Sequence, residues 1–322
     1  MSAIRPLSAT SITWAISILA LLMSVLNFSL ARRAEKKRDK LRHRDDRREV
    51  ERLLWAAWPK LWGPGSFSMT RDQATLDEAD GYITEAARLE PDYPRVLEYQ
   101  GHLLEVQGNK PAARKLYEKS IALDSTRGRA YICLAQVLEN EDKLRLLGRA
   151  IQCDPDDVKV AATAYYLIGL HYRLLGQYQV AYNYINQALV LRPAYSEALV
   201  LMGRVLANLG RRDEAIDSYE KAVSSSPTCI DAMVNLGALI SDTDWASGLA
   251  WIEHAMRIDP KNDYPYAMLA AVYADRKQPK EALQFYERAV ELNPQRRTRA
   301  DSTQEIVREM TKLLETGGEK PQ

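Results

Sequence analysis

Small and large apolar residues recur along the chain at a spacing of 34 positions, most regularly between residues 162 and 227. Each 34-residue unit contains two amphipathic stretches of helical period separated by a short turn, which predicts a pair of helices. Small residues at positions 8, 20 and 27 of the unit let the two helices approach closely, and larger residues at positions 4, 7, 11 and 24 fill the space around them. Proline is usual at position 32, where it ends the second helix. A period of this length predicts a solenoid.

Six full units and one half unit follow this pattern. The half unit carries Ala79, Ile83 and Ala86 at second-helix positions, and the Gly63-Pro64-Gly65 stretch before it is not expected to supply a first helix. A last helix at 301–316 is expected to cap the array, because a solenoid end needs one covered and one solvated face, and the tail 317–322 is expected to be disordered. The predicted full units are 94–127, 128–157, 158–195, 196–229, 230–262 and 263–296.

One irregularity interrupts the period. Position 27 is occupied by Ser120, Ala150 and Ala188 in successive units, at gaps of 30 and then 38 residues. The second unit is therefore four residues short and the third is four residues long, so the array regains its phase. Residues 139–161, where this happens, are interpreted either as a tolerated irregularity or as a functional kink.

A different pattern precedes the repeats. After a short tail, 1–10, residues 11–31 carry no charge and are long enough to cross a hydrocarbon core of about 30 Å as a helix. A cleaved signal peptide and a buried helix are the alternatives, but the single Arg5 before this segment and its long apolar core favour a retained anchor. Eight Lys and Arg residues follow within 32–44, so the positive-inside rule predicts an external N-terminus and cytoplasmic repeats. A bacterial inner membrane is the first expectation and a eukaryotic organelle membrane the second.

The segment 32–66 is predicted to be a charged juxtamembrane helix followed by a Gly/Pro joint, with Pro59 ending the helix. Its alternating charges are typical of a solvated helix. Alternatively, the basic residues of 32–44 contact anionic lipid headgroups, and three tryptophans pack on the membrane or on the solenoid: Trp55, Trp58 and Trp62.

Charge and composition reduce the range of functions. The chain has 44 basic and 43 acidic residues, a net charge of +1, which disfavours a nucleic-acid partner. Its three cysteines form no CxxC pair and its four histidines are widely separated, which argues against a metal site. Since no phosphate-binding glycine loop or nucleophile elbow occurs either, the chain is predicted to be neither an enzyme nor a cofactor-binding protein.

The repeat residues themselves resemble the tetratricopeptide repeat (TPR). The clearest pair of units contains Gly169, Tyr172, Gly176, Ala181, Ala188 and Pro193, which recur as Gly203, Leu206, Gly210, Ala215, Ala222 and Pro227. The resemblance implies an all-α fold, a right-handed TPR α-solenoid behind an N-terminal transmembrane helix. It also implies that the first helices line a concave surface for peptides, helices or folded partners. The family's carboxylate clamp is not predicted, since Glu98 and His102 stand where it needs Lys and Asn.

The residues of the concave surface follow from the helical period. Positions 4, 7, 8 and 11 face the second helix, so positions 2, 5, 9 and 12 are expected to face the hollow. Its centre is predicted to be apolar with a charged rim, as in many interfaces, although these side chains could instead contact neighbouring first helices. The predicted groove residues are Arg95, Glu98, His102, Arg129, Gln136, Tyr166, Leu170, Arg173, Glu197, Val200, Arg204, Asp231, Val234 and Tyr264.

These features together predict a membrane-anchored scaffold or adaptor that recruits a protein or peptide partner through the groove. The partner's identity does not follow from the sequence, and homo-oligomerisation stays open. The alternative is an assembly or secretion factor whose repeats lie on the non-cytoplasmic side of the membrane.

Overall fold

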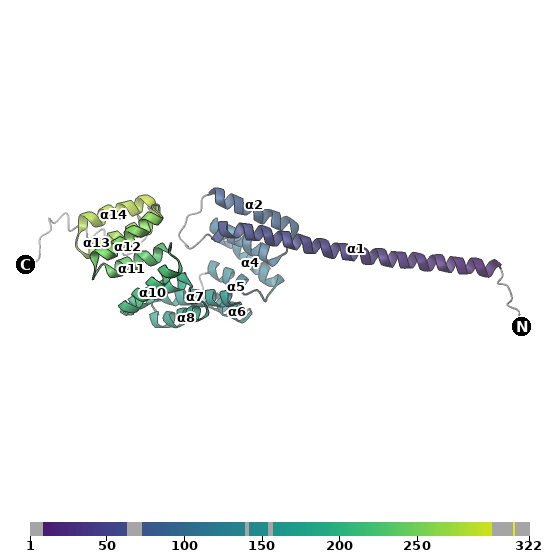
Figure 1. Cartoon of the computed structure of the whole chain (residues 1–322), viewed down its shortest axis with the longest axis horizontal. Helices are drawn as coiled ribbons and strands as arrows, with labels where there is room; N and C mark the ends of the chain where they lie inside the picture. Colours follow the sequence, from purple (N-terminus) through teal and green to yellow (C-terminus); the bar gives the residue numbers. More distant parts are fainter. Residues whose placement is uncertain (1–8, 63–72, 139–141, 154–156, 298–311, 313–322) are drawn as a thin grey trace, which may run out of the picture.

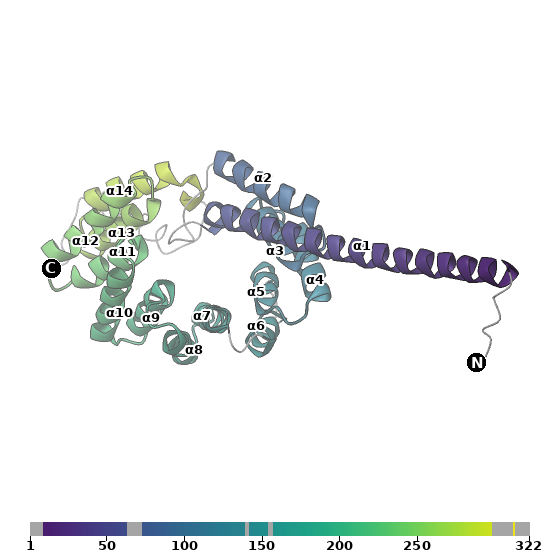
Figure 2. The ribbon, with the colours of Figure 1, turned by 45° about the vertical axis from the view of Figure 1, so that its right-hand side comes forward.

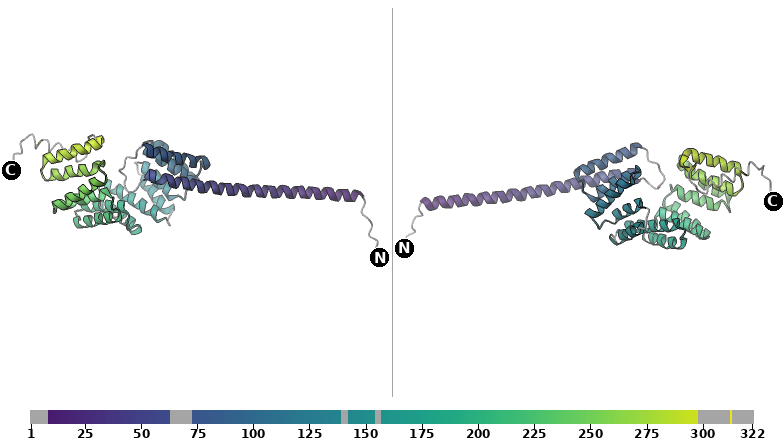
Figure 3. Two further views of the ribbon diagram at one scale, coloured as in Figure 1. Left: turned by 45° about the horizontal axis from the view of Figure 1, so that its top comes forward. Right: turned by 180° about the vertical axis from the view of Figure 1, so that it is seen from behind.

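The computed structural model describes residues 9–62, 73–138, 142–153, 157–297 and 312; the side chains of 9–31, 34, 62 and 297 lie outside that description. Within these ranges the fold is entirely helical, with fourteen α-helices and a 3-10 turn at Pro294–Arg297. One helix, α1 (Ala9–Trp62), projects far beyond the others, which form a curved array (Figures 1 and 3). The predicted all-α repeat solenoid is thereby confirmed.

The array consists of helix pairs joined by short turns. The half unit forms α2 (Gln73–Leu89). The full units form α3 (Pro94–Val106) and α4 (Lys110–Leu123), α5 (Gly128–Val137) and α6 (Asp142–Cys153), α7 (Val158–Leu174) and α8 (Tyr178–Leu191), α9 (Ser196–Asn208) and α10 (Arg212–Ser225), α11 (Ile230–Ile240) and α12 (Trp245–Ile258), and α13 (Asp263–Asp275) and α14 (Pro279–Leu292).

Small residues bring the two helices of a pair together, as at Gly203 in α9. A Cβ atom at this position would lie 2.5 Å from the Tyr219 ring of α10, so only glycine fits without a shift of the ring. The turn that follows contains Gly210 at φ +75°, a left-handed conformation that ends α9 at low cost. Helix pairing and the tight turn therefore both depend on glycine.

First and second helices occupy opposite sides of the curve. In Figure 2, α5, α7 and α9 lie on its inner side, and α6, α8 and α10 lie on its outer side. Successive first helices also contact each other, from α3 and α5 through α11 and α13. The largest hydrophobic cluster runs through this middle part, from Tyr131 to Leu236. The inner wall is consequently a continuous row of first helices.

Changes in helix length absorb the irregular spacing. Helix α5 has 10 residues and α6 has 12, whereas α7 has 17. The shortened second unit is therefore compensated by a longer first helix in the third, and the pairs keep their order along the curve. Residues 139–141 and 154–156 lie outside the described part.

The start of the array differs from the expectation that α2 stands alone, because the end of α1 packs against it as a first helix. The side chains of Val50, Leu54, Ala57 and Leu61 are fully buried, in one hydrophobic cluster with Ile83 and other residues of α2 and α3. Helix α1 contacts both α2 and α3, as a first helix does in the later units. The opening unit is therefore complete.

Polar contacts reinforce this junction. The Nε of Arg47 donates a hydrogen bond of 2.7 Å to Oε2 of Glu90, and its guanidinium carbon lies 3.6 Å from the centroid of the Tyr93 ring. Further along α1, Glu51 accepts a hydrogen bond of 2.5 Å from the Tyr93 hydroxyl and pairs with Arg95. The junction thus combines a buried apolar stripe with ion pairs at its edge.

The prediction that Pro59 ends the helix was wrong, because α1 continues to Trp62. A proline removes the hydrogen bond to the carbonyl four residues earlier, which belongs to Trp55. Both residues lie on the exposed side of α1, and the Trp55 side chain is 72% exposed, so water can replace the lost donor. Trp58 instead packs on the solenoid, with its ring centroid 6.2 Å from that of Tyr99.

Several predictions fall on residues that lie outside the description. They are the side chains of the anchor 11–31, the joint at 63–66, the capping helix 301–316 and the tail 317–322. Within the described part of the chain, no helix is both long enough and apolar enough to cross a membrane.

Candidate functional site

All fourteen predicted groove residues lie on first helices, but they do not form one surface. The structure divides them by their position in the repeat. Position 5 is buried in every full unit, with exposed fractions of 9% or less: Glu98, Ile132, Tyr166, Val200, Val234 and Ala267. The predicted groove residues at positions 2, 9 and 12 are only partly buried, although Ser241 and Ala274 close position 12 in the last two units. The accessible part of the inner wall is therefore narrower than the predicted stripe.

Glu98 shows most clearly why position 5 is closed. Its side chain is 1% exposed and accepts hydrogen bonds of 2.7 and 3.2 Å from the guanidinium of Arg127, which precedes α5. The hydroxyl of Ser120 in α4 lies 3.4 Å away, and Arg129 lies 3.9 Å away. Glu98 thus connects three helices of neighbouring units.

The opening end of the groove is occupied by internal contacts. Arg95 pairs with Glu51 of α1, and Arg129 stacks its guanidinium carbon 4.3 Å from the Trp58 ring. The Nδ1 of His102 lies 3.5 Å from Glu105. Gln136, at the end of α5, is half-buried. The contacts of Arg95 and Arg129 with α1 join it to the first two full units. The charged side chains at this end of the groove are therefore engaged in contacts within the chain.

Tyr166, Val200 and Val234 belong to the hydrophobic packing of the middle units. The ring of Tyr166 lies 5.4 Å from that of Tyr195 at a tilt of 49°, and burial raises the pKa of the Tyr166 hydroxyl. Leu170, one turn later on α7, packs partly against the same cluster and stays half-exposed. This region therefore supplies an apolar floor with Leu170 at its edge.

A polar cluster beside this floor joins α9, α11 and α13. Nη2 of Arg204 lies 3.4 Å from the Tyr264 hydroxyl and 3.8 Å from Oδ2 of Asp231. The Tyr264 hydroxyl in turn donates a hydrogen bond of 3.1 Å to Oδ1 of Asn235. Residues 60 positions apart in the sequence are brought together here, because successive first helices lie side by side. Glu197 lies on the same helix as Arg204 and is half-buried.

Arg173, in the last turn of α7, is the least satisfied member of the predicted set. Its side chain is half-buried, and its Nε is inaccessible to solvent and has no hydrogen-bond partner. Burial lowers the pKa of Arg173, and the positive charge of nearby Arg204 lowers it further. Arg173 and Arg204 thus belong to neighbouring first helices of the inner wall, α7 and α9.

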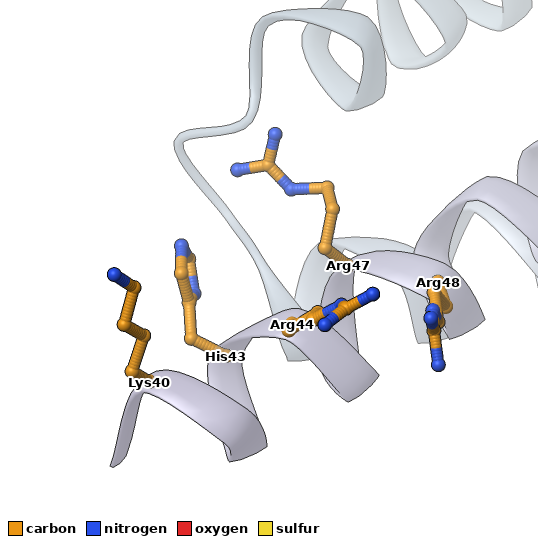
Figure 4. Close-up of a pocket in the computed structure, with 5 residues that line it drawn as sticks. All are labelled: Lys40, His43, Arg44, Arg47 and Arg48. Atoms are coloured by element: carbon orange, nitrogen blue, oxygen red, sulfur yellow. The ribbon is translucent and has the colours of Figure 1, made fainter. Parts of the chain in front are cut away.

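A second surface lies on α1, before its junction with the solenoid. Figure 4 shows five basic side chains that line an open hollow there: Lys40, His43, Arg44, Arg47 and Arg48. Of these, His43 and Arg47 pair with Glu90, at 3.3 and 2.5 Å. The other three are exposed, so a basic face remains available next to the predicted anchor.

Among the described residues, no group of three or more His, Cys, Asp or Glu side chains is placed to bind a metal ion. The site instead consists of two arginines, tyrosine hydroxyls and aliphatic side chains on a rigid helical wall. Such a surface can bind a complementary protein segment by hydrogen bonds and apolar contact.

Comparison with known proteins identifies the repeats. Family models described as tetratricopeptide repeat match residues 71–127, 162–195, 196–229 and 264–296. These repeats are tetratricopeptide repeats. The match at 71–127 includes α2, the helix that pairs with the end of α1, and the match at 162–229 includes both Arg173 and Arg204. The tetratricopeptide repeats therefore carry the candidate site.

Two known proteins are similar to this chain over part of their length. Tetratricopeptide repeat protein 37 of Xenopus laevis is 26% identical over 159 residues, 48% of this chain and 10% of that protein. Anaphase-promoting complex subunit 7 of Dictyostelium discoideum is 27% identical over 184 residues, 55% of this chain and 31% of that protein. The chain thus spans about a tenth and about a third of these relatives.

A solved tetratricopeptide-repeat structure extends the likeness to nearly the whole array. The protein from Parabacteroides merdae superposes with a TM-score of 0.56 at 16% identity, covering 82% of this chain and 99% of that one. At this identity the likeness shows the fold alone. Proteins of this repeat class generally bind other proteins, and the subunit from Dictyostelium discoideum belongs by its name to a complex.

Proposed function

We propose that this chain is a scaffold that binds a protein partner in its concave groove and holds that partner at a membrane. The observation that carries the binding role is the half-buried Arg173, which lies one turn after the half-exposed Leu170 on the first helix α7. An apolar contact next to strong hydrogen-bond donors is the usual composition of an interface.

The proposed membrane attachment rests on the sequence of 11–31, which has no charged residue over 21 positions. The basic face of α1 supports it, since exposed Lys40, Arg44 and Arg48 could contact anionic headgroups. In this proposal the N-terminus is external and the repeats are cytoplasmic, because Lys and Arg residues accumulate after the apolar segment.

Site-specific photocrosslinking tests the binding role. A benzoylphenylalanine at Leu170 on α7 should crosslink the partner in native membranes, whereas one at Val190 on α8 should not. Val190 is 67% exposed and belongs to a second helix, so it is a matched position on the outer face. Crosslinking from Val190 and none from Leu170 would assign the partner to the convex surface and reject the groove.

The orientation is tested separately by protease protection of a C-terminal tag in right-side-out vesicles. We expect the tag to be protected until the membrane is permeabilised. A tag that is cleaved in intact vesicles would favour the second candidate, an assembly or secretion factor whose repeats lie outside the cytoplasm. A chain that washes off the vesicles in carbonate would reject the anchor itself.

A further inference from the structure

The outer face of α8 differs from that of every other second helix in a full unit, because it carries no charge. Six positions of each second helix point away from its first helix: 18, 19, 22, 25, 26 and 29, counted from the small residue at position 27. Helices α4, α6, α10, α12 and α14 each have at least two charged residues there. On α8 these positions are exposed and neutral: Gln179, Val180, Asn183, Asn186, Gln187 and Val190.

Helix α10 shows that charge is compatible with these positions. One repeat later in the sequence, the same six positions hold Asp213, Glu214, Asp217, Glu220, Lys221 and Ser224. The neutral stretch also includes the turn before α8, since residues 174–191 contain no charged side chain. Two leucines at that turn, Leu174 and Leu175, are 69% and 58% exposed, and Val190 is 67% exposed. Depletion of charge around exposed apolar side chains is typical of the centre of an interface.

The charge of the outer side changes across this neutral face. Helix α6 has three basic residues and one acidic residue, whereas α10 has four acidic and two basic residues. Figure 2 shows α6, α8 and α10 in this order along the outer side of the curve. A partner for the face therefore needs a neutral centre between an acidic flank and a basic flank, and a second copy of this chain provides that arrangement.

Symmetry decides how two copies fit together, and two-fold dimers are the commonest oligomers. A two-fold axis parallel to α8 places α8 against α8 of the other copy, and α6 of each copy opposite α10 of the other. Opposite charges then face each other, for example the exposed Arg149 of one copy, at position 26, and the exposed Glu220 of the other, at position 25. An axis across the helices would instead place α10 opposite α10, with four acids on each side, and such like charges disfavour association.

We propose that two copies of this chain form a two-fold symmetric dimer through the outer faces of α8, with these helices parallel and with α6 of each copy opposite α10 of the other. The contact lies on the opposite side of the repeats from the groove, so both grooves stay accessible and the inference does not depend on the proposed groove function. Two convex surfaces meet over a small area, so we expect a low affinity in solution. Two chains attached to one membrane would associate more strongly, since attachment raises their effective concentration.

Cysteine crosslinking of the full chain in detergent tests the contact. Asn183→Cys and Val190→Cys lie in the middle and near the end of α8, and Ser224→Cys is the matched control, since Ser224 occupies on α10 the position of Val190. Under mild oxidation we expect disulfide-linked dimers from both α8 variants, and none from Ser224→Cys or from the unsubstituted chain with its own three cysteines. Dimers from neither α8 variant, or equally from Ser224→Cys, would overturn the proposal. Dimers from Asn183→Cys alone would overturn the parallel arrangement, because antiparallel helices bring a residue to its own copy at one level only.

A charge swap measured by sedimentation equilibrium tests the flanks. Arg149→Glu places an acid opposite Glu220 of the other copy and should weaken the dimer by about tenfold or more, and Glu220→Arg should do the same. The double variant restores opposite charges and should restore the dimer. Both residues are exposed, so all three variants should keep the helicity and Tm of the unsubstituted chain. A double variant no more dimeric than the single variants would refute the pairing of α6 with α10.

Photocrosslinking in native membranes distinguishes a second copy from another occupant of the face. A benzoylphenylalanine at Val190 should give a product with twice the mass of the chain, which differs from any product that contains the groove partner. A product of another mass, with none of twice the mass, would assign the α8 face to a different protein and overturn the dimer. Because the groove partner is detected at Leu170 and the second copy at Val190, either proposal can fail while the other stands.

Discussion

Removing the carboxylate of Glu98 should destabilise the first part of the solenoid rather than weaken partner binding. The sequence pattern places Glu98 in the groove, but the structure buries it to 1% exposure against Arg127, whose side chain is 23% exposed. Loss of one member of a buried ion pair costs about 3–5 kcal/mol, because the other charge remains without its partner. Since Arg127 keeps some contact with water, we expect Glu98→Ala to cost about 2–4 kcal/mol.

The assay is thermal unfolding followed by circular dichroism, together with hydrogen exchange. For an array of this size, about 2–4 kcal/mol corresponds to a fall in Tm of roughly 4–16 °C. The units of a solenoid contact mainly their neighbours. The loss of exchange protection should therefore be concentrated in α3, α4 and α5, which Glu98, Ser120 and Arg127 connect.

Two further variants test whether Glu98 stabilises the fold through its buried ion pair. Glu118→Ala removes an exposed i,i+4 partner of Arg114, at 2.7 Å, and should cost only about 0.3–0.5 kcal/mol. The double variant Glu98→Gln with Arg127→Gln should recover part of the stability, because neither charge then remains buried alone. If Glu98→Ala matched Glu118→Ala in Tm yet abolished crosslinking from the groove, the buried ion pair would be wrong and the sequence-based assignment right.

Three further predictions concern the packing and the cysteines. Gly248→Ala should lower the free energy of unfolding by about 1–3 kcal/mol, because the new Cβ would lie 2.6 Å from the carbonyl oxygen of Gly237 in α11. Gly148→Ala, whose Cβ would have no atom within 4 Å, should raise it by about 0.5–1 kcal/mol. Urea titration measures both. Leu54→Ala should lower the free energy of unfolding by about 2–5 kcal/mol, while a truncation of exposed Trp55 should leave it within about 0.5 kcal/mol. Burial raises the pKa of the Cys133 thiol to about 12, so its thiolate fraction at pH 8 is about one in 10⁴ and maleimide should label it only after denaturation.

The pairing of helices could be predicted because it depends on local spacing. Small residues at positions 8, 20 and 27 determine which sides of two adjacent helices meet, and Gly203 against Tyr219 illustrates that contact. The end of α1 could not be placed in the same way, because the connection to α2 is longer than the turns within the repeats and breaks the period. Its apolar stripe at Val50, Leu54, Ala57 and Leu61 is nevertheless a helical signal, and the expectation that a tryptophan packs on the solenoid holds for Trp58.

The groove was predicted less accurately because the contact between units is not local. A helical wheel shows which side faces the helix partner within a unit, but the row at position 5 is closed by the first helix of the next unit. The buried partners of this row, such as Arg127 for Glu98 and Tyr195 for Tyr166, stand before the neighbouring first helix in the sequence. Asn235 was likewise missed, since only the approach of α13 brings Tyr264 to it.

The continuity of α1 changes what anchoring would do for this protein. A flexible joint would let the solenoid rotate freely around its anchor and would only raise the local concentration of the partner. Helix α1 instead runs without a break over 54 residues, about 80 Å, and its last turns form part of the first repeat pair. If residues 11–31 span a membrane as proposed, the groove is held at a fixed distance from it and in a fixed direction. The contacts of Arg47 and Glu51 with Glu90, Tyr93 and Arg95 then set the orientation in which the proposed groove meets a partner.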